Sequence, residues 1–274
     1  IGQVVLTLGD GESMPLKRDT NRLIFGGTML QVRNERGTLV YSRIKSKEAS
    51  EKIVYNTLTV PVRERFQLVL ADGTKVFLNS GSEMRYPERF GKARREVFLK
   101  GEAWFEVAKD SAREFWVHAG AMDVKVLGTS FNVKAYERLE TVATTLVEGS
   151  VEVACAGKSF QIVPGEQFVY DKNNRVMDVR MVDTESYVSW KDGYYKFRQT
   201  TLEEIMETLS VWYGLNVFYV NESAKQVEFT GKVKRYEDAR MLLDKFEQTG
   251  DVVFDIKGNN VFITIKQKKP FARE

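Results

Sequence analysis

The chain has very few of the residues that most often build metal sites and catalytic sites. Among its 274 residues there is one cysteine, Cys155, and one histidine, His118. A lone cysteine excludes a disulfide framework within the chain, and the two residues together cannot complete the four-ligand shell of a structural zinc ion. An unpaired cysteine fits a reducing compartment without excluding an oxidising one. We therefore expect no metal site, and the sequence implies no cofactor.

Long apolar runs and a strong net charge are also missing. No apolar segment approaches the ~18 residues that a membrane-spanning helix requires. The 41 basic residues nearly balance the 38 acidic ones, and the two signs are interspersed, which argues against a nucleic-acid partner. The 43% of hydrophobic residues is ordinary for one large or two average soluble domains. Because the sequence begins in mid-strand, with IGQVVLTLGDGE, we expect it to be a piece of a longer protein.

Residues 1–185 have the pattern of β-strands almost throughout. Runs of five to eight β-branched and aromatic residues alternate with Gly, Asn, Asp and Pro at fairly regular spacing. In LVLADGTKVFLNS, the Asp72-Gly73 pair between two apolar runs predicts a tight hairpin. This pattern predicts an all-β domain of stacked or sandwich-like, antiparallel sheets over residues 1–185.

From residue 186 onward the hydrophobic period changes. A helical stripe follows Thr201, a suitable N-cap residue, and ends at Gly214, a suitable C-cap residue; it consists of Leu202, Ile205, Met206, Leu209 and Trp212 or Tyr213. A second helix is predicted over 236–248, and strands surround both. The order β-α-β, β-α-β-β predicts a small α+β domain over 186–268, with two helices on one face of a three- to five-stranded sheet. Residues 269–274 form a tail.

Candidate catalytic groups are few and poorly arranged. Glu102 and Glu106 share one face of a predicted strand, but four residues separate them by about 13 Å, more than the roughly 5–9.5 Å of glycosidase pairs. The serines of Ser80-Gly81-Ser82 lack the G-x-S-x-G context of a nucleophile. His118 lies in a strand-like run, where a packed or edge residue is the more common role. We expect no catalytic site and no enzyme.

Several phrases, in their order along the chain, resemble the periplasmic region of FecR-family anti-sigma regulators of the Bacteroidetes type. These are NTLTVP, LVLADGTKVFLNSGSEMRYPERF, REVFLKGEAWFEVAKD, FWVHAGAMDVKVLGTSFNVKAY, TLVEGSVEV and VPGEQ. The region from WKDGYYKFRQTTLEEIMETLSVWYGLNVFY to NVFIT resembles the C-terminal domain of those regulators, which is related to the short N-terminal domain of secretins and TonB-dependent receptors. The turn at Pro61-Val62-Arg63 departs from the family's Pro-Arg-Gly type.

The resemblance implies a signalling function. An outer-membrane TonB-dependent transporter would present its N-terminal signalling domain to this chain. The state would then pass through a membrane helix and a cytoplasmic segment, both absent from this sequence, to an extracytoplasmic-function (ECF) sigma factor, with proteolysis as a relay step. The implied location is the periplasmic side of a single-pass inner-membrane protein. No small-molecule substrate is implied.

The predicted contact region is the 186–268 domain, through an exposed strand edge around residues 226–233. Aromatic residues crowd its beginning, and strand addition by a partner is a natural use of an open edge. The candidate contact residues are Gln226, Glu228, Thr230, Lys232 and Tyr219. Two alternatives stay open: a carbohydrate-binding or carbohydrate-active β-domain, and a fragment of a receptor or secretin.

Overall fold

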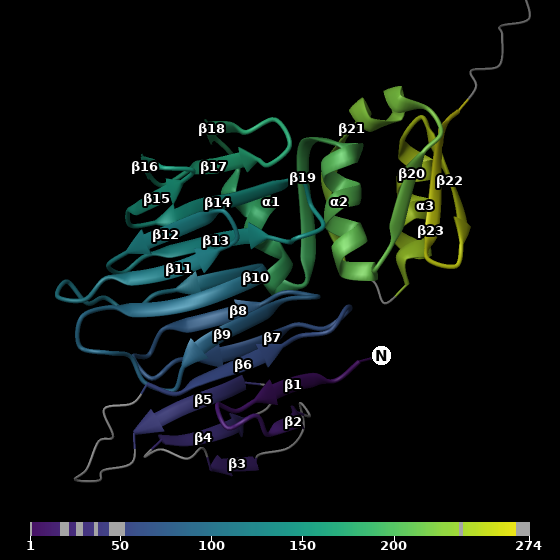
Figure 1. Cartoon of the computed structure of the whole chain (residues 1–274). Helices are drawn as coiled ribbons and strands as arrows, with labels where there is room; N and C mark the ends of the chain where they lie inside the picture. The colour runs from purple at the N-terminus through teal and green to yellow at the C-terminus, as the bar shows by residue number, and fades with distance from the viewer. Residues whose placement is uncertain are drawn as a thin grey trace, which may run out of the picture. The chain divides into compact units, whose positions relative to one another are not determined.

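The computed structural model describes residues 2–16, 22–25, 30–35, 38–43, 53–235 and 238–266. The chain divides into two compact units, Ile1–Lys191 and Asp192–Glu274. Residues 186–191, which the sequence pattern assigns to the second domain, therefore lie in the first unit. The predicted 269–274 tail lies outside the described residues. Strands dominate the first unit and the second mixes strands with helices, which confirms the predicted fold class (Figure 1).

The first unit contains two sheets that share one strand. The first sheet has the order β2 (Ser13–Leu16), β1 (Val4–Thr7), β6 (Tyr55–Thr59), β9 (Glu83–Pro87), β10 (Arg95–Glu106), β11 (Phe115–Ala119), β12 (Met122–Val126), β15 (Val151–Cys155) and β16 (Lys158–Ile162). The second sheet has the order β3 (Arg22–Phe25), β4 (Leu30–Glu35), β5 (Thr38–Arg43), β7 (Phe66–Val69), β8 (Lys75–Leu78), β10, β13 (Ser130–Ala135), β14 (Thr141–Glu148), β17 (Glu166–Asp171) and β18 (Val176–Met181).

The shared strand, β10, explains how one chain builds both sheets. Its first half pairs with β9 and β11, and its second half, from Gly101 onward, pairs with β8 and β13. Gly101 lies at the crossing with φ +105°, a backbone conformation that favours glycine. A Cβ there would lie 2.7 Å from the Cα of Ser82, so the two strands approach too closely for any larger residue.

The two sheets pack on a single hydrophobic core. Alternate residues of facing strands contribute to it, such as Val97 and Val117 from the first sheet and Phe105 and Phe131 from the second, all with no exposed surface. Most pairings are antiparallel, as predicted, but β10–β11 and β5–β7 are parallel. Helix α1 (Thr184–Val188) lies near the end of the unit, and the short helix η1 (Ser189–Asp192) spans its boundary with the second unit. Cys155 is buried in β15, and burial raises the pKa of its thiol.

The second unit has the predicted element order. It consists of β19 (Tyr194–Thr201), α2 (Leu202–Tyr213), β20 (Asn216–Tyr219), η2 (Glu222–Gln226), β21 (Glu228–Lys234), α3 (Ala239–Thr249), β22 (Val252–Lys257) and β23 (Asn260–Ile265). The hydroxyl of Thr201 accepts the amide of Glu204, and Gly214 ends α2 in the left-handed conformation. The predicted stripe is buried, and so are Ala239, Leu242, Leu243 and Phe246 of α3.

The strands of this unit do not form the single sheet that the sequence predicts. β19 and β21 form a two-stranded antiparallel ribbon, while β20, β23 and β22 form a separate three-stranded sheet in that order. The prediction was wrong on this point because strand pairing across an intervening helix leaves no local signal in the sequence. The second unit therefore has two separate β-surfaces, one on the ribbon and one on the three-stranded sheet.

Candidate functional site

The β19–β21 ribbon has one buried face and one exposed face. Phe197 of β19 and Phe229 of β21 both contact the ring of Phe246 in α3, with ring centroids 5.9 and 4.8 Å apart. Tyr195 is also buried, and the guanidinium of Arg235 lies 5.3 Å from its ring centroid. These contacts fix the ribbon on the helical layer, and alternation then turns the intervening residues outward.

Three of the five predicted contact residues lie on this ribbon. Glu228, Thr230 and Lys232 are all exposed residues of β21, at alternate positions along the strand. Their outer face also carries Tyr194, Lys196 and Lys234. We refer to Tyr194, Lys196, Glu228, Thr230, Lys232 and Lys234 as the ribbon face. The hydroxyl of Thr230 accepts the amide of Gln199 at 2.9 Å, at the irregularity where the ladder shifts register.

The other two predicted residues lie elsewhere. Gln226 is the last residue of η2, not a strand residue, and it is exposed. Tyr219 belongs to β20 in the three-stranded sheet, and its hydroxyl is 3.5 Å from the carbonyl oxygen of Leu202. Burial raises the pKa of this hydroxyl, and the negative charges of nearby glutamates raise it further; these are Glu203, Glu207 and Glu222. The ammonium of Lys225 lies 5.4 Å from the Tyr219 ring centroid and pairs with Glu203 and Glu222, so both signs of charge surround this tyrosine.

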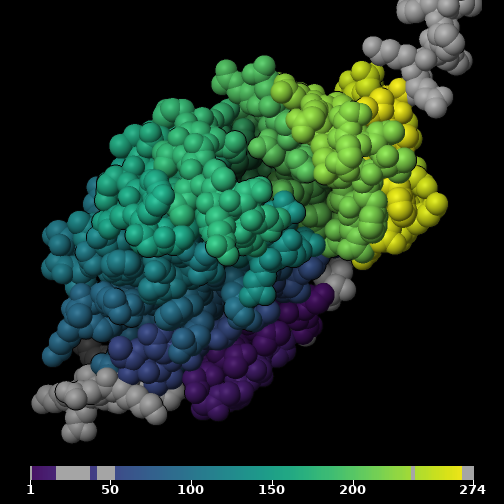
Figure 2. Space-filling model, turned by 45° about the horizontal axis from the view of Figure 1, so that its top comes forward, coloured from purple at the N-terminus to yellow at the C-terminus, as the bar shows by residue number. Residues whose placement is uncertain are grey.

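The three-stranded sheet has an exposed apolar surface that the sequence analysis did not single out. Phe218 is 47% exposed and Val253 is 42% exposed, and Val220, just past the end of β20, is 62% exposed. Phe218 stacks on Phe262 of β23 with ring centroids 5.1 Å apart. Residues of β22 and β23 form the yellow surface in Figure 2. The apolar run NVFYV was the available signal, but it does not tell which face of the strand remains open.

The candidate catalytic carboxylates of the first unit have structural roles. Glu102 is buried and accepts the side-chain amides of Asn79 and Asn132 at 2.8 and 2.9 Å. Glu106 accepts the indole N–H of Trp104 at 3.2 Å and lies 3.6 Å from the ammonium of Lys75. Both carboxylates are therefore held by strand neighbours.

The serines and the histidine are also engaged within the fold. Ser80 accepts the backbone amide of Arg63, and Ser82 accepts that of Glu102, at 3.0 and 2.9 Å. Both serines are buried. His118 lies in β11, with its Nδ1 2.7 Å from Asp123 and its Nε2 3.4 Å from Glu96. The ring of His118 thus contacts Asp123 and Glu96 on the two strands beside β11, and neither of these contacts involves Ser80 or Ser82.

Aromatic rings on the outer face of the first sheet do not form a flat platform for a sugar ring. Phe98 stacks on His118 with centroids 4.9 Å apart, and Trp116 lies parallel to His118 on the same strand at 6.2 Å. The ammonium of Lys125 lies 5.6 Å from the Trp116 ring. Because the rings face one another along a row, their flat faces are not available as one open surface.

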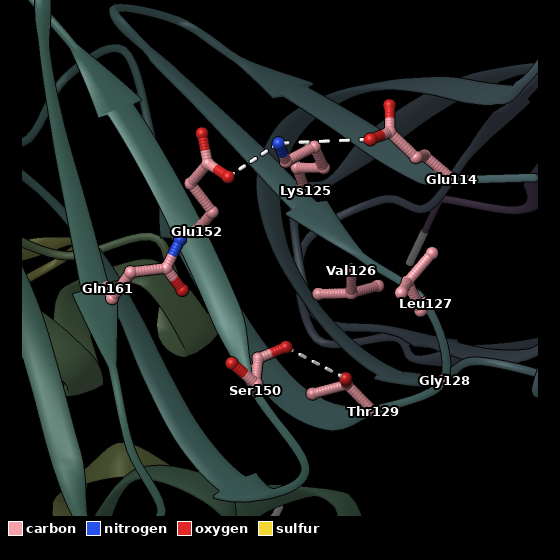
Figure 3. Close-up of a pocket in the computed structure, with 9 residues that line it drawn as sticks. All are labelled: Glu114, Lys125, Val126, Leu127, Gly128, Thr129, Ser150, Glu152 and Gln161. Atoms are coloured by element: carbon pink, nitrogen blue, oxygen red, sulfur yellow. Dashed lines mark hydrogen bonds and ion pairs between the residues drawn. The ribbon is translucent and has the colours of Figure 1, made fainter. Parts of the chain in front are cut away.

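A cavity of about 310 Å³ lies beside this row (Figure 3). Lys125 lies between Glu152, at 2.5 Å, and Glu114, at 3.8 Å. The hydrogen bond with Lys125 lowers the pKa of Glu152, and the same bond raises the pKa of the lysine. Thr129 donates to the carbonyl of Ser150 across the lower part of the cavity. The one ammonium of the cavity is thus paired with both of its carboxylates.

No cluster of three His, Cys, Asp or Glu residues suited to a metal ion occurs in the described ranges. No helix there is long and apolar enough to cross a membrane.

Comparisons with known proteins identify two families along the chain. The family described as FecR protein matches residues 56–152, and the one described as FecR, C-terminal matches residues 194–263. The first match falls within the β-unit, and the second covers the ribbon, both helices and the three-stranded sheet. A search of curated proteins found no match.

Two crystal structures of a candidate anti-sigma factor from Parabacteroides distasonis ATCC 8503 have a similar fold. The structure at 1.65 Å resolution is 27% identical, with a TM-score of 0.70, and the match covers 77% of this chain and 99% of that chain. The structure at 2.50 Å resolution is 28% identical, with a TM-score of 0.69, and the match covers 78% and 100%.

Proposed function

Because this chain belongs to the FecR family of anti-sigma factors, we propose that it receives a signal from the N-terminal signalling domain of an outer-membrane TonB-dependent transporter. Family membership makes the chain a sensory region of an anti-sigma factor. In the proposal it lies on the periplasmic side of the inner membrane and relays the signal to an ECF sigma factor. The predicted step of regulated proteolysis belongs to the same relay.

The observation that supports this proposal is the second unit, which matches the C-terminal family and has exposed strand residues and an exposed apolar surface. An α+β unit of this size buries its helices on one side of each sheet and leaves strand edges and outer faces open. Such edges take up an extended partner segment through main-chain hydrogen bonds. A signal requires different affinities for two partner states, because only a difference in affinity shifts an equilibrium.

The test is a titration of residues 1–274 against the signalling domains of TonB-dependent transporters from the same organism. We expect saturable binding to one of these domains and none to the plug domain of the same transporter, which serves as the matched control. Circular dichroism establishes that the chain is folded. Absence of binding to every signalling domain by the folded chain would contradict the proposal.

A further inference from the structure

Strand β18 is the last strand of the second sheet, and one of its edges is open. It pairs with β17, and with no other strand among the described residues of the chain. β16, β17 and β18 lie together at the end of the first unit opposite β2 and β3 (Figure 1). An open edge presents a row of backbone N–H and C=O groups, which a further strand can take up.

The backbone groups at this open edge belong to alternate residues of β18. The amide of Val182, directly after the strand, donates to the carbonyl of Gly165 at 2.9 Å, and this bond continues the register of β17 and β18. Hydrogen-bonded pairs alternate with non-hydrogen-bonded pairs along an antiparallel ladder. The even-numbered residues of β18 therefore bond to β17, and the backbone groups of its odd-numbered residues point to the open edge. These are Met177, Val179 and Met181.

The two faces of β18 differ in their chemistry. Val179 stands opposite Phe168, a core residue of β17, so the odd-numbered side chains lie on the core side of the sheet. Val179 is only half-buried there, and Met181 is 71% exposed. The other face carries Asp178 and Arg180, which are both exposed and have opposite charges. The strand thus has an apolar side and a side with one charge of each sign.

This strand is complementary to a second copy of itself. Antiparallel pairing about a two-fold axis at Val179 places Val179 opposite Val179 of the second copy, and Met177 opposite Met181. The backbone groups of these residues point to the open edge, so each of these pairs can exchange two hydrogen bonds. The same register places Asp178 of each copy opposite Arg180 of the other. Opposite charges that face each other across two strands stabilise the pairing.

Arg180 keeps its contacts within the chain in this arrangement. Its Nε and Nη2 donate to the side-chain oxygen of Gln167 at 3.4 and 3.2 Å. A guanidinium has five N–H donors, so it can also bond the carboxylate of Asp178 in the second copy. The pairing therefore adds contacts and requires no charge to be unpaired beforehand. An edge strand with charges of one sign would instead repel its own copy.

We propose that the chain forms a two-fold dimer through antiparallel pairing of β18 with β18 of a second copy. The second sheet then continues from one copy into the other, and the half-buried apolar side chains at the two ends cover each other. A contact of one short strand per copy is small, so we expect a reversible equilibrium with a Kd of about 10–500 µM. The inference concerns the first unit and is independent of the proposed function.

The test is sedimentation equilibrium of residues 1–274 at about 5 µM to 1 mM, with each variant checked for folding by circular dichroism. Asp178→Arg gives the outer face of β18 two positive charges, and Arg180→Asp gives it two negative charges. The double variant exchanges the two charges. Glu12→Arg is the matched control, because it makes the same change in net charge as Asp178→Arg at an exposed position of the β1–β2 turn.

We expect the wild type, the control and the double variant to dimerise with Kd values within about threefold of one another. Each single variant should dimerise at least tenfold more weakly, because like charges then face each other. An equimolar mixture of the two single variants should dimerise as the wild type does, since a positive strand faces a negative one. A wild type that is monomeric at 1 mM would overturn the inference and leave this edge to a strand of another protein. Single variants that dimerise as tightly as the wild type would also overturn it.

A cysteine variant tests the register without any change of charge. Val179 lies on the proposed two-fold axis, so Val179→Cys places two cysteines opposite each other, at a Cα separation of about 5.5 Å that suits a disulfide. Val62→Cys is the control, because Val62 is 42% exposed and lies in the turn between β6 and β7. Mild oxidation should cross-link the first variant into a dimer and leave the control monomeric on a non-reducing gel; the buried Cys155 is the same in both. Equal cross-linking of the two variants, or none in Val179→Cys, would contradict the pairing.

Discussion

The guanidinium of Arg95 lies 2.8 Å from the carboxylate of Asp72, and both side chains are almost fully buried. Asp72 is the turn residue that predicts the hairpin between β7 and β8, and it also accepts the backbone amide and the hydroxyl of Thr74. Arg95 opens β10 and donates to the carbonyls of Ala108 and Arg113 as well. The pair ties a hairpin turn to the strand that both sheets share.

Removal of the arginine charge should strongly destabilise the first unit. Arg95→Met leaves Asp72 as a buried, uncompensated carboxylate, and breaking a buried pair in this way costs about 3–5 kcal/mol. The measurement is urea unfolding at neutral pH. Arg94→Met is the matched control, because Arg94 is 56% exposed in its pair with Glu96 and should change stability by less than about 1 kcal/mol. Equal effects of the two variants would refute the structural role of Arg95.

Gly101 should tolerate no side chain. Gly101→Ala combines a positive φ with a Cβ that would lie 2.7 Å from the Cα of Ser82, so strands must separate to admit it. We expect a loss of about 3 kcal/mol or more in the free energy of unfolding. Gly120→Ala has a positive φ but no atom within 4 Å of the new Cβ, and it should lose only about 1 kcal/mol. A similar loss of stability in both variants would mean that the close approach of Gly101 to Ser82 does not contribute to the free energy of unfolding.

Stability should fall at alkaline pH because of a buried tyrosine pair. The hydroxyls of Tyr41 and Tyr86 are 2.9 Å apart, and burial raises the pKa of Tyr41 to about 12 and that of Tyr86 well above its usual value. Unfolded tyrosines ionise near pH 10, so this contribution is complete below about pH 10 and is lost as the pH rises toward 12. For Tyr41 alone the loss is about 3 kcal/mol.

The measurement is the free energy of unfolding between pH 8 and 12 in the wild type and in Tyr41→Phe. The variant should be less stable at pH 8, since the side-chain amide of Asn56 loses its 2.8 Å acceptor. Its decline above pH 10 should be shallower by about 3 kcal/mol in total. An identical pH slope in the two proteins would show that Tyr41 does not contribute to the decline.

The end of the first unit should depend on one indole hydrogen bond. Trp190 in η1 is buried and donates from Nε1 to the side-chain oxygen of Asn132 at 3.2 Å. Trp190→Phe leaves that oxygen without this donor in a buried site, which costs about 1–3 kcal/mol in the free energy of unfolding. Trp116→Phe is the control, because its indole donates to Glu114 at an exposed position. Chemical unfolding of both variants decides the point: a loss in the control as large as that in Trp190→Phe would speak against the buried bond.

The sequence predicts the parts of the fold that depend on short-range signals. Asp72-Gly73 marks a hairpin, and Thr201 and Gly214 mark the ends of α2, because caps and turns involve residues a few positions apart. The alternation of Glu228, Thr230 and Lys232 is likewise visible in the sequence. The double membership of β10 and the separation of the ribbon from the three-stranded sheet are not, since both arise from strands distant in the chain.

The candidate site shows the same limit. Tyr219 and Lys232 are both near the predicted edge in sequence, yet the structure assigns them to different sheets. Gln226 is the last residue of the short helix η2, and β21 starts two residues later, at Glu228. What the sequence could not provide is which residues stand opposite each other, and that depends on the register of β19 against β21.

The shared strand β10 also limits how the first unit can change in length. A one-residue insertion within β10 would invert the side chains that follow it and so move core residues such as Phe105 to the outside. Because β10 belongs to both sheets, the inverted side chains would disturb the packing of both sheets. Length variation should therefore accumulate at open hairpin tips such as Gly120 and Gly157, where an added Cβ meets no atom within 4 Å.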